Sequence, residues 1–367
     1  MADTLKSQFG PAVPRELARM IRAVHAEFPH EDFVRDVLKG YGPLSLTGRG
    51  WHIAAALQRH LPADYPRAVE ILVASSTQPR AAAAGGMDSF LYIPHLFFVS
   101  KHGLAHFEES MRAQHALTQL FTAEFSIRAF LETHPQRTLA RLREWTKDPS
   151  PHVRRLVSEG TRPRLPWAPR LRAFQQDPAP VIELLELLKD DPELYVRRSV
   201  ANNLNDIGKD HPEVVAGLAR RWLREATPER QWIVRHALRS AIKRADAGAL
   251  RALGYGGKAS VAIRDVQIAP AKAAIGGDVT ISFTVKSTGA KRQRVMVDLV
   301  VHFVKSRGTG AKTFKLKAVE LAPGESVGVR KKISLKQHTT RKHYVGKHVV
   351  EVLLNGARRR MGTFLVS

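Results

Sequence analysis

The sequence predicts a multidomain protein in which an all-α solenoid of repeated helix pairs precedes an immunoglobulin-like β-sandwich. Two observations predict this order. Apolar residues recur at helical spacing up to about residue 254, whereas after "LGYGGKAS" they alternate in short runs. A block that begins at Asp148 also returns at Asp191. We therefore expect a helical domain over 1–254, a linker over 255–258 and a basic β-sandwich over 259–367.

The helical part contains an internal repeat. "DPSPHVRRLVSEG" begins at Asp148, "DPELYVRRSVANN" at Asp191, and a weaker copy, "TPERQWIVRHALRSA", at Thr227. The first residue of each block is a good helix cap and the proline suits a first turn. A period near 40 residues is typical of HEAT-like repeats, whose stacked helix pairs form a concave binding surface.

Aligning the copies on Val153, Val196 and Val234 places polar residues on one flank of each helix. The equivalent pairs on that flank are Arg155 and Glu159, Arg198 and Asn202, and His236 and Ser240. Asp206 follows Asn202 by one turn. The repeat thus predicts a basic groove that holds two carboxylates, Glu159 and Asp206, beside arginines suited to phosphates.

The C-terminal part predicts six or seven short strands. The runs are "VTISFTV", "RVMVDLVVHFV", "KTFKLKAVEL", "GESVGVRKKISL", "HVVEVLL" and "GTFLVS". This number of strands in about 110 residues suits an immunoglobulin-type sandwich, without its disulfide because the chain has no cysteine. In the helical part, the glycine-rich stretches 48–50 and 81–86 are predicted to be loops.

The charge of the chain indicates a polyanionic partner. Its formal net charge is +24, and residues 258–367 hold 22 Lys and Arg against 6 Asp and Glu. DNA, RNA or an acidic membrane surface would each suit this field, and binding to a phosphate backbone would weaken steeply with salt. Within "GARRRMG", Arg358, Arg359 and Arg360 are either phosphate contacts or a solvated strand edge, and we expect the former.

Several classes of protein are excluded or disfavoured. The lack of cysteine excludes disulfides, thiolate metal sites and cysteine nucleophiles. Neither HExxH nor a GxxxxGK[ST] loop occurs, so we expect no metal ion and no cofactor. The start resembles no signal peptide, and the most apolar run, "SFLYIPHLFFVS", is too short to span a bilayer. We expect a cytoplasmic protein that binds no membrane.

The stretch "HVRRLVSEGTRPRLPW", residues 152–167, raises a chemical question, because one glutamate stands among arginines beside an aromatic ring. Taken singly, Glu159 could be a salt-bridge partner, Trp167 a packed loop residue and Asp206 a polar helix end. Together they suit attack on a cationic base, which leaves its sugar as a neutral molecule. Trp167 would attract the base by about 0.5–2 kcal/mol. Glu159 and Asp206 would stabilise an oxocarbenium-like sugar and orient or deprotonate water. The arginines expected to contact phosphates and keep these carboxylates ionised are Arg155, Arg162, Arg164 and Arg198.

The blocks "SEGTRPRLPW" and "VRRSVANNLNDI", followed by an immunoglobulin-like region, resemble the AlkC-type bacterial DNA alkylation repair glycosylases. The resemblance implies monofunctional excision of bases such as 3-methyladenine and 3-methylcytosine, which leaves an abasic site. It implies catalytic roles for Glu159 and Asp206 and a base-binding role for Trp167. It adds Glu124, in "FTAEFSIRAF", as a further acidic residue of the cleft. Arg155 and Arg162 match basic positions near that site.

The expected partner is double-stranded DNA with alkylated bases, bound by a monomer at the bacterial nucleoid. Two other interpretations remain open. One is a non-catalytic HEAT-repeat protein that binds damaged or distorted DNA, and the other is a protein–protein scaffold. Carboxylates in the groove favour an enzyme, because a protein that only binds DNA gains nothing from acids that face phosphates. The net charge disfavours a scaffold.

Overall fold

A computed structural model describes residues 5–79, 88–337 and 342–367 of the chain. The chain divides into two compact units, Met1–Asp210 and His211–Ser367. Helices give way to strands between α17 (Ala247–Ala252) and β1 (Val261–Ala269), which confirms the predicted α-then-β order. The last four helices group with the strands rather than with the other helices. The predicted domain limits at 254 and 259 therefore stay a prediction.

The first unit is entirely helical. Its elements are α1 (Leu5–Gln8), α2 (Ala12–Val24), α3 (His30–Leu38), α4 (Leu46–His60), α5 (Tyr65–Ser75), η1 (Asp88–Tyr92), α6 (Ile93–His102), α7 (Phe107–Leu117), α8 (Ser126–Thr133), α9 (Pro135–Trp145), α10 (Pro151–Gly160), α11 (Arg172–Gln176), α12 (Ala179–Leu188) and α13 (Leu194–Ile207).

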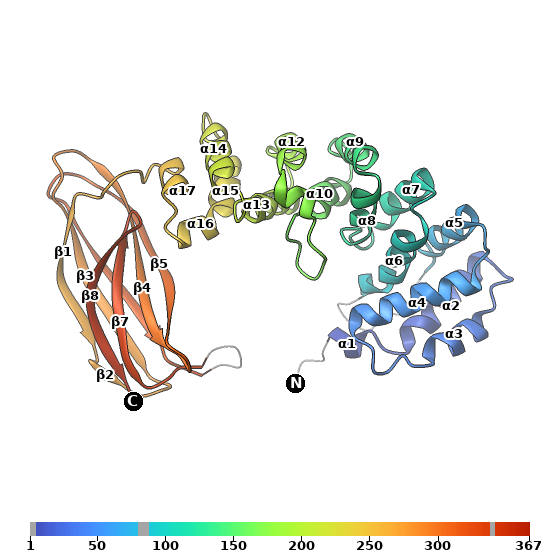
Figure 1. Cartoon of the computed structure of the whole chain (residues 1–367), viewed down its shortest axis with the longest axis horizontal. Coiled ribbons are helices and arrows are strands. Elements are labelled where there is room, and N and C mark those ends of the chain that lie inside the picture. Colours follow the sequence, from blue (N-terminus) through green and yellow to red (C-terminus); the bar gives the residue numbers. More distant parts are fainter. Residues whose placement is uncertain (1–4, 80–87, 338–341) are drawn as a thin grey trace. The chain divides into compact units, whose positions relative to one another are not determined.

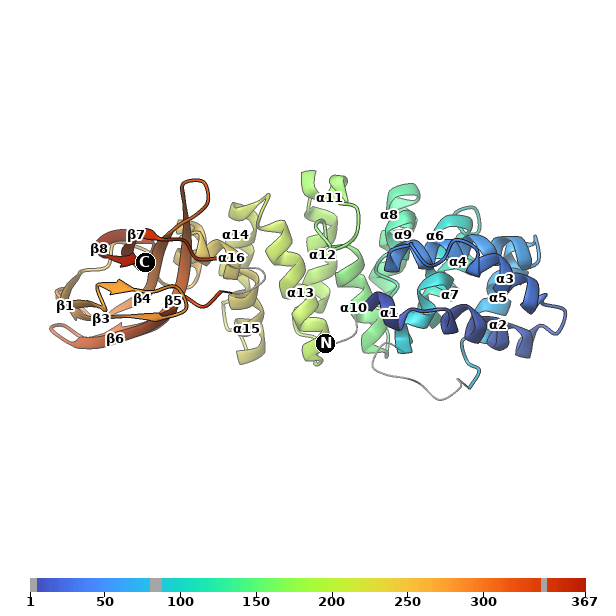
Figure 2. The ribbon, with the colours of Figure 1, turned by 90° about the horizontal axis from the view of Figure 1, so that it is seen from below.

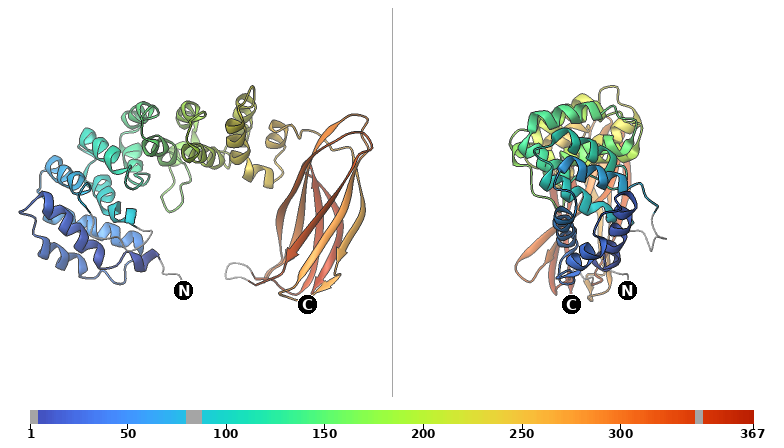
Figure 3. Two further views of the ribbon diagram at one scale, coloured as in Figure 1. Left: turned by 180° about the vertical axis from the view of Figure 1, so that it is seen from behind. Right: turned by 90° about the vertical axis from the view of Figure 1, so that its right-hand side faces the viewer.

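Within this unit the helices form two layers. Figure 1 shows α5, α7, α9 and α12 along one side, and α6, α8, α10 and α13 along the other. Figure 3 (left) shows the same layers from behind, whereas in Figure 2, seen from below, the two layers overlap. Apolar faces such as Val153, Leu156 and Val157 of α10 are buried between the layers. This is the HEAT-like arrangement that the repeat predicts.

The aspartates that open the first two repeats do not cap the following helices, contrary to our expectation. Asp148 Oδ1 accepts a hydrogen bond from the Ser150 backbone N at 2.8 Å, and Asp191 Oδ1 accepts one from the Glu193 backbone N at 2.9 Å. They thus shape the turn that precedes each helix. In the third copy Thr227 does cap its helix, since its side chain accepts from the Arg230 backbone N.

Two further local predictions are wrong. Residues 48–50 lie inside α4 rather than in a loop, because Gly50 lets α4 pack closely on α6. A Cβ added at Gly50 would lie only 2.7 Å from Ile93 Cγ2. The third repeat helix ends at Ala237, and Leu238 separates it from α16, so Ser240 lies in a different helix from His236. The other predicted loop, 81–86, lies outside the described residues.

The second unit contains four helices and a β-sandwich. The helices are α14 (Pro212–Trp222), α15 (Pro228–Ala237), α16 (Arg239–Lys243) and α17. The strands are β1, β2 (Lys272–Ala273), β3 (Asp278–Ser287), β4 (Gln293–Val304), β5 (Thr309–Leu321), β6 (Ser326–Ser334), β7 (Gly346–Leu354) and β8 (Ala357–Val366).

The strands make two sheets, in the orders β1-β3-β6 and β2-β8-β7-β4-β5. Alternating residues such as Val279, Ile281, Phe283 and Val285 fill the core between them. All six predicted strands are present, and β1 and β2 are added to them. Within the described residues, none of the helices is both long and apolar enough to cross a bilayer.

Candidate active site

Two carboxylates of the first unit meet at one guanidinium. Glu159 lies near the end of α10 and Asp206 near the end of α13, at related positions of successive repeats. Arg162 reaches both. Its Nη1 lies 2.5 Å from Glu159 Oε1, and its Nε and Nη2 each lie 2.8 Å from Asp206 Oδ2. Glu159 is 5% exposed and Asp206 1% exposed, so the pairing is nearly dry. Burial opposes the charge of Arg162, but the two carboxylates outweigh it and raise the pKa of the guanidinium.

Each carboxylate has a second polar partner. Ser199 Oγ, from α13, donates to Glu159 Oε2 at 2.6 Å. Lys209 Nζ lies 2.7 Å from Asp206 Oδ1. These contacts fix the orientation of both side chains before any substrate arrives, which favours a preorganised site.

Glu124 joins the same cluster through Arg155. Arg155 Nη1 lies 2.8 Å from Glu124 Oε2, and Arg155 Nη2 lies 3.6 Å from Glu159 Oε2. Thr122 Oγ1 also donates to Glu124 at 2.9 Å. Burial raises the pKa of Glu124, Glu159 raises it further, and Arg155 lowers it only in part. The residues form a charge chain, the name used below for Glu124, Arg155, Glu159, Arg162 and Asp206 in that order.

A cavity of about 310 Å³ opens beside this charge chain. Glu124, Arg155, Glu159, Arg162 and Trp167 line it, together with apolar side chains from α4, α6 and the loop before α8. Asp206 does not line it and lies behind Arg162. The cavity therefore combines aromatic and apolar side chains with two carboxylates in its lining.

Trp167 stands out among the lining residues. Its side chain is 77% exposed and its φ is 65°, in the left-handed region that bulky residues rarely adopt. Such strain persists only where the surrounding structure enforces it, and it concentrates at functional sites. The exposed indole is thus available to a ligand that enters the cavity.

Arg128 of α8 enforces the loop that carries Trp167. Its Nη1 donates to the carbonyl of Gly160 at 3.1 Å and of Arg162 at 2.7 Å, and its Nη2 donates to the carbonyl of Pro169. The guanidinium ties both ends of the loop to one helix, at a cost, since burial lowers its pKa to about 10. No pattern in the sequence points to Arg128, because its partners are backbone carbonyls more than 30 residues away.

The other arginines that we predict to contact DNA do not form one cluster. Arg164 pairs with Asp210 through an Nε–Oδ2 contact of 2.8 Å, and Arg198 is exposed without an ion pair to any described residue. In β8, Arg358 lies 3.3 Å from Glu351 and Arg359 donates to the Val261 carbonyl at 2.8 Å, while Arg360 is exposed. Their contact with phosphates stays a prediction. For Arg155 and Arg162 the structure instead shows carboxylate partners.

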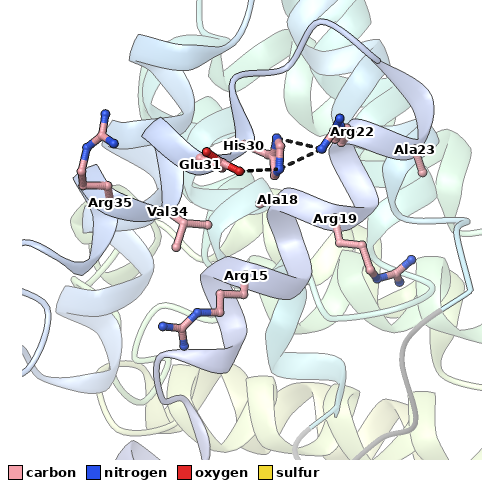
Figure 4. Close-up of a pocket in the computed structure, with 9 residues that line it drawn as sticks. All are labelled: Arg15, Ala18, Arg19, Arg22, Ala23, His30, Glu31, Val34 and Arg35. Carbon is pink, nitrogen blue, oxygen red and sulfur yellow. Dashed lines mark hydrogen bonds and ion pairs between the residues drawn. The ribbon is translucent and has the colours of Figure 1, made fainter.

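A larger cleft, about 710 Å³, lies between α2 and α3 (Figure 4). Arg15, Arg19, Arg22 and Arg35 line it, but three of these arginines already have side-chain partners. Arg19 pairs with Glu16, Arg35 with Asp32, and Arg22 donates to His30. This cleft has no paired carboxylates beside an aromatic face, so we place the candidate site at the charge chain.

Comparisons with known proteins identify the family of the chain. A family described as "DNA alkylation repair enzyme" matches residues 120–245, which include the whole charge chain and Trp167. The family of the C-terminal Ig-like domain of uncharacterised protein YhaZ matches residues 262–367.

Two full-length relatives extend these matches. Uncharacterised protein YhaZ of Bacillus subtilis (strain 168) is 36% identical over 360 residues, which is 97% of each chain. The structure of Pseudomonas fluorescens alkylpurine DNA glycosylase AlkC, bound to DNA containing an abasic site analogue, is 40% identical. Its TM-score is 0.88 and the match covers 100% of both chains.

Proposed function

Because the chain belongs to the family of AlkC alkylpurine DNA glycosylases, we propose that it hydrolyses the N-glycosidic bond of alkylated bases in DNA. The protein is a DNA glycosylase of alkylation repair, and its partner is DNA. The observation that supports this function is a cavity lined by Trp167 together with Glu124 and Glu159. In such a reaction the aromatic ring attracts the flat cationic base. The carboxylates stabilise the positive charge that develops on the sugar.

The substrates that suit the site best are bases made cationic by N-alkylation, of the 3-methyladenine and 3-methylcytosine class. The C1′–N bond breaks with its electron pair going to the base, which leaves neutral. The sugar then carries oxocarbenium-like positive charge. Water bonds to C1′ and loses a proton, so the products are a free base and an abasic site. Because the leaving group is already activated, little general acid is required.

The three carboxylates of the charge chain have different roles. Glu159 faces the cavity and stabilises the sugar cation, and Glu124 faces it from the other end of Arg155. Asp206 adds negative charge from behind Arg162, where the nearly dry surroundings strengthen its field. One of the cavity-facing carboxylates orients the attacking water and accepts its proton. Arg155 and Arg162 hold these carboxylates in place.

DNA binding draws on the remaining positive charge. Residues 258–367 carry an excess of 16 positive charges, and the strands place Arg358 and Arg360 at the surface. We assign these arginines, with Arg359, Arg164 and Arg198, to the phosphate backbone. The protein acts as a monomer on nucleoid DNA in the bacterial cytoplasm, as a base excision repair enzyme without a metal or cofactor.

The competing function is binding of damaged DNA without catalysis. Replacing Glu159 with glutamine separates the two, because the side chain keeps its shape and loses its charge. We expect Glu159→Gln to lose base excision by about 100-fold or more and to keep its DNA affinity. Glu183→Gln, a surface glutamate paired with Arg143, is the matched control. If wild-type protein binds alkylated DNA and releases no base, the non-catalytic function is correct.

A further inference from the structure

The helical repeat departs from its own pattern at two buried positions of α13. Ser199 occupies the position of Leu156 in the first copy and of Ala237 in the third, and Asn203 occupies the position of Gly160. All five residues are buried, with Ser199 2% exposed and Asn203 0% exposed. A buried hydroxyl or amide costs free energy unless it is hydrogen-bonded. A polar residue at a core position that is otherwise apolar or small therefore requires a reason other than packing.

Ser199 contacts a carboxylate of the candidate active site. Its Oγ donates to Glu159 Oε2 at 2.6 Å and lies 3.0 Å from Ser158 Oγ. The Arg162 guanidinium approaches the other carboxylate oxygen, Oε1, at 2.5 Å. A carboxylate that is held at both oxygens cannot rotate without losing one of these contacts. Ser199 thus fixes the side chain of Glu159 from the α13 side.

Asn203 contacts the end of α10, where the chain turns from Glu159 towards Arg162. Its Nδ2 donates to the backbone carbonyl of Ser158 at 2.7 Å and to Thr161 Oγ1 at 3.1 Å. Its Oδ1 is buried and has no hydrogen-bond partner among the described residues. The side chain therefore joins α13 to α10 even though one of its polar atoms stays unpaired, which costs free energy.

Asp206 continues the same side of α13. It follows Ser199 and Asn203 at spacings of four and three residues, which place all three on one face of the helix. The three side chains contact, in turn, the Glu159 carboxylate, the end of α10 and the Arg162 guanidinium. These contacts fix the register between α10 and α13 at which Glu159 and Asp206 share one arginine.

We propose that Ser199 and Asn203 are positioning residues, which replace apolar packing between α10 and α13 with contacts that orient Glu159. The inference rests on the proposed function, because Glu159 is the carboxylate that we assign to the sugar cation. Neither residue is among those that line the cavity, so both act through Glu159 and the turn that follows it. Electrostatic stabilisation is most effective when the charge is oriented before the reaction begins.

The test measures single-turnover release of bases from methylated duplex DNA at increasing protein concentration. This separates the rate at saturation from the half-saturating concentration. The variants of the full chain are Ser199→Ala, Asn203→Ala and the matched control Ser110→Ala. Ser110 is also a fully buried helical residue, but it is hydrogen-bonded to Tyr65 and Gly103, outside the charge chain. Because alanine stands at the equivalent position of the third copy, Ser199→Ala should fold.

We expect Ser199→Ala to lower the rate at saturation by about 10- to 100-fold, since a misplacement of about 1 Å can cost about 100-fold. Asn203→Ala should lower the same rate, because the turn that carries Arg162 loses its anchor. The half-saturating concentration should stay unchanged in both variants, and Ser110→Ala should change neither quantity. Rates at saturation equal to that of Ser110→Ala would overturn the proposal. So would a change confined to the half-saturating concentration, which would indicate a role in DNA binding.

A double-mutant cycle separates positioning of Glu159 from a general structural effect. If Ser199 acts through the Glu159 carboxylate, Ser199→Ala should cause little further loss in the Glu159→Gln background. An equal fold-loss in both backgrounds would overturn the assignment of Ser199. Base release by wild type is the reference for all variants. Its absence would refute the proposed function, whereas release by wild type and undiminished release by Ser199→Ala would refute this inference alone.

Discussion

Removal of Arg162 is the most informative perturbation of the charge chain. In Arg162→Met the side chain keeps much of its apolar length but loses the guanidinium that Glu159 and Asp206 share. Deleting one partner of a buried ion pair costs about 3–5 kcal/mol, because the other charge is left without compensation. Two carboxylates lose Arg162 at once, but Ser199 and Lys209 still contact them. We therefore expect the free energy of unfolding to fall by about 3–5 kcal/mol rather than by twice that amount.

The direction of the pH dependence follows from the same contacts. In the variant, the folded state would take up protons at the two stranded carboxylates more readily than the unfolded state does. Its free energy of unfolding should therefore fall as pH rises, and the difference in stability between variant and wild type should become smaller as pH falls. In wild type the carboxylates hold Arg162 charged, so no such recovery is expected.

Urea unfolding measures the stability change, and single-turnover base release measures the chemistry. Arg59→Met is the matched control, since Arg59 pairs with Asp36 at a more exposed position and should cost about 0–1 kcal/mol. We expect Arg162→Met to lose about 100-fold in base release through misplacement of Glu159. If Arg162→Met were as stable and as active as Arg59→Met, the charge chain would not organise the site.

Three other outcomes are expected. Trp167→Ala should slow excision of cationic bases by about 2- to 30-fold, the range of one cation–π contact, and slow neutral lesions less; an equal loss for both would indicate a packing role. Replacing Arg358, Arg359 and Arg360 with glutamine should reduce the slope of log affinity against log salt by about 1 for each phosphate that no longer meets an arginine; an unchanged slope would remove β8 from the DNA interface. Arg128→Met should leave buried carbonyls unpaired, destabilise the chain by about 1–3 kcal/mol, and lower excision more than Arg128→Lys does; excision at the wild-type rate in Arg128→Met would show that the Trp167 loop needs no such anchor.

Much of the fold follows from local patterns in the sequence. Alternating apolar residues identify β3, β4 and β7, because each strand buries one face against the other sheet. The repeat places Glu159 and Asp206 on the same flank of neighbouring helices, with Asp206 one turn after the equivalent of Glu159. For this reason the sequence alone predicts that they lie close together. The prediction from the third copy is wrong for Ser240, because α15 ends at Ala237 and a helical wheel applies only within one continuous helix.

What the sequence could not predict depends on contacts between distant residues. The arginines near Glu159 indicate phosphate binding in the sequence, yet Arg155 and Arg162 bridge carboxylates from α10, α13 and the turn before α8. Arg128 resembles any helical arginine until its carbonyl partners are known. Gly50 looked like part of a loop, because only the packing of α4 on α6 explains the missing side chain. The strained backbone of Trp167 likewise has no local signal.

Base release tests the central claim most directly. Methylated duplex DNA is incubated with wild type, with Glu159→Gln and with the control Glu183→Gln, and the free bases are identified by chromatography and mass. We expect wild type and the control to release 3-methyladenine or 3-methylcytosine, and Glu159→Gln to release neither while it still binds the DNA. Tight binding by wild type without any free base would contradict the assignment as a glycosylase. Full release by Glu159→Gln would place the chemistry away from the charge chain.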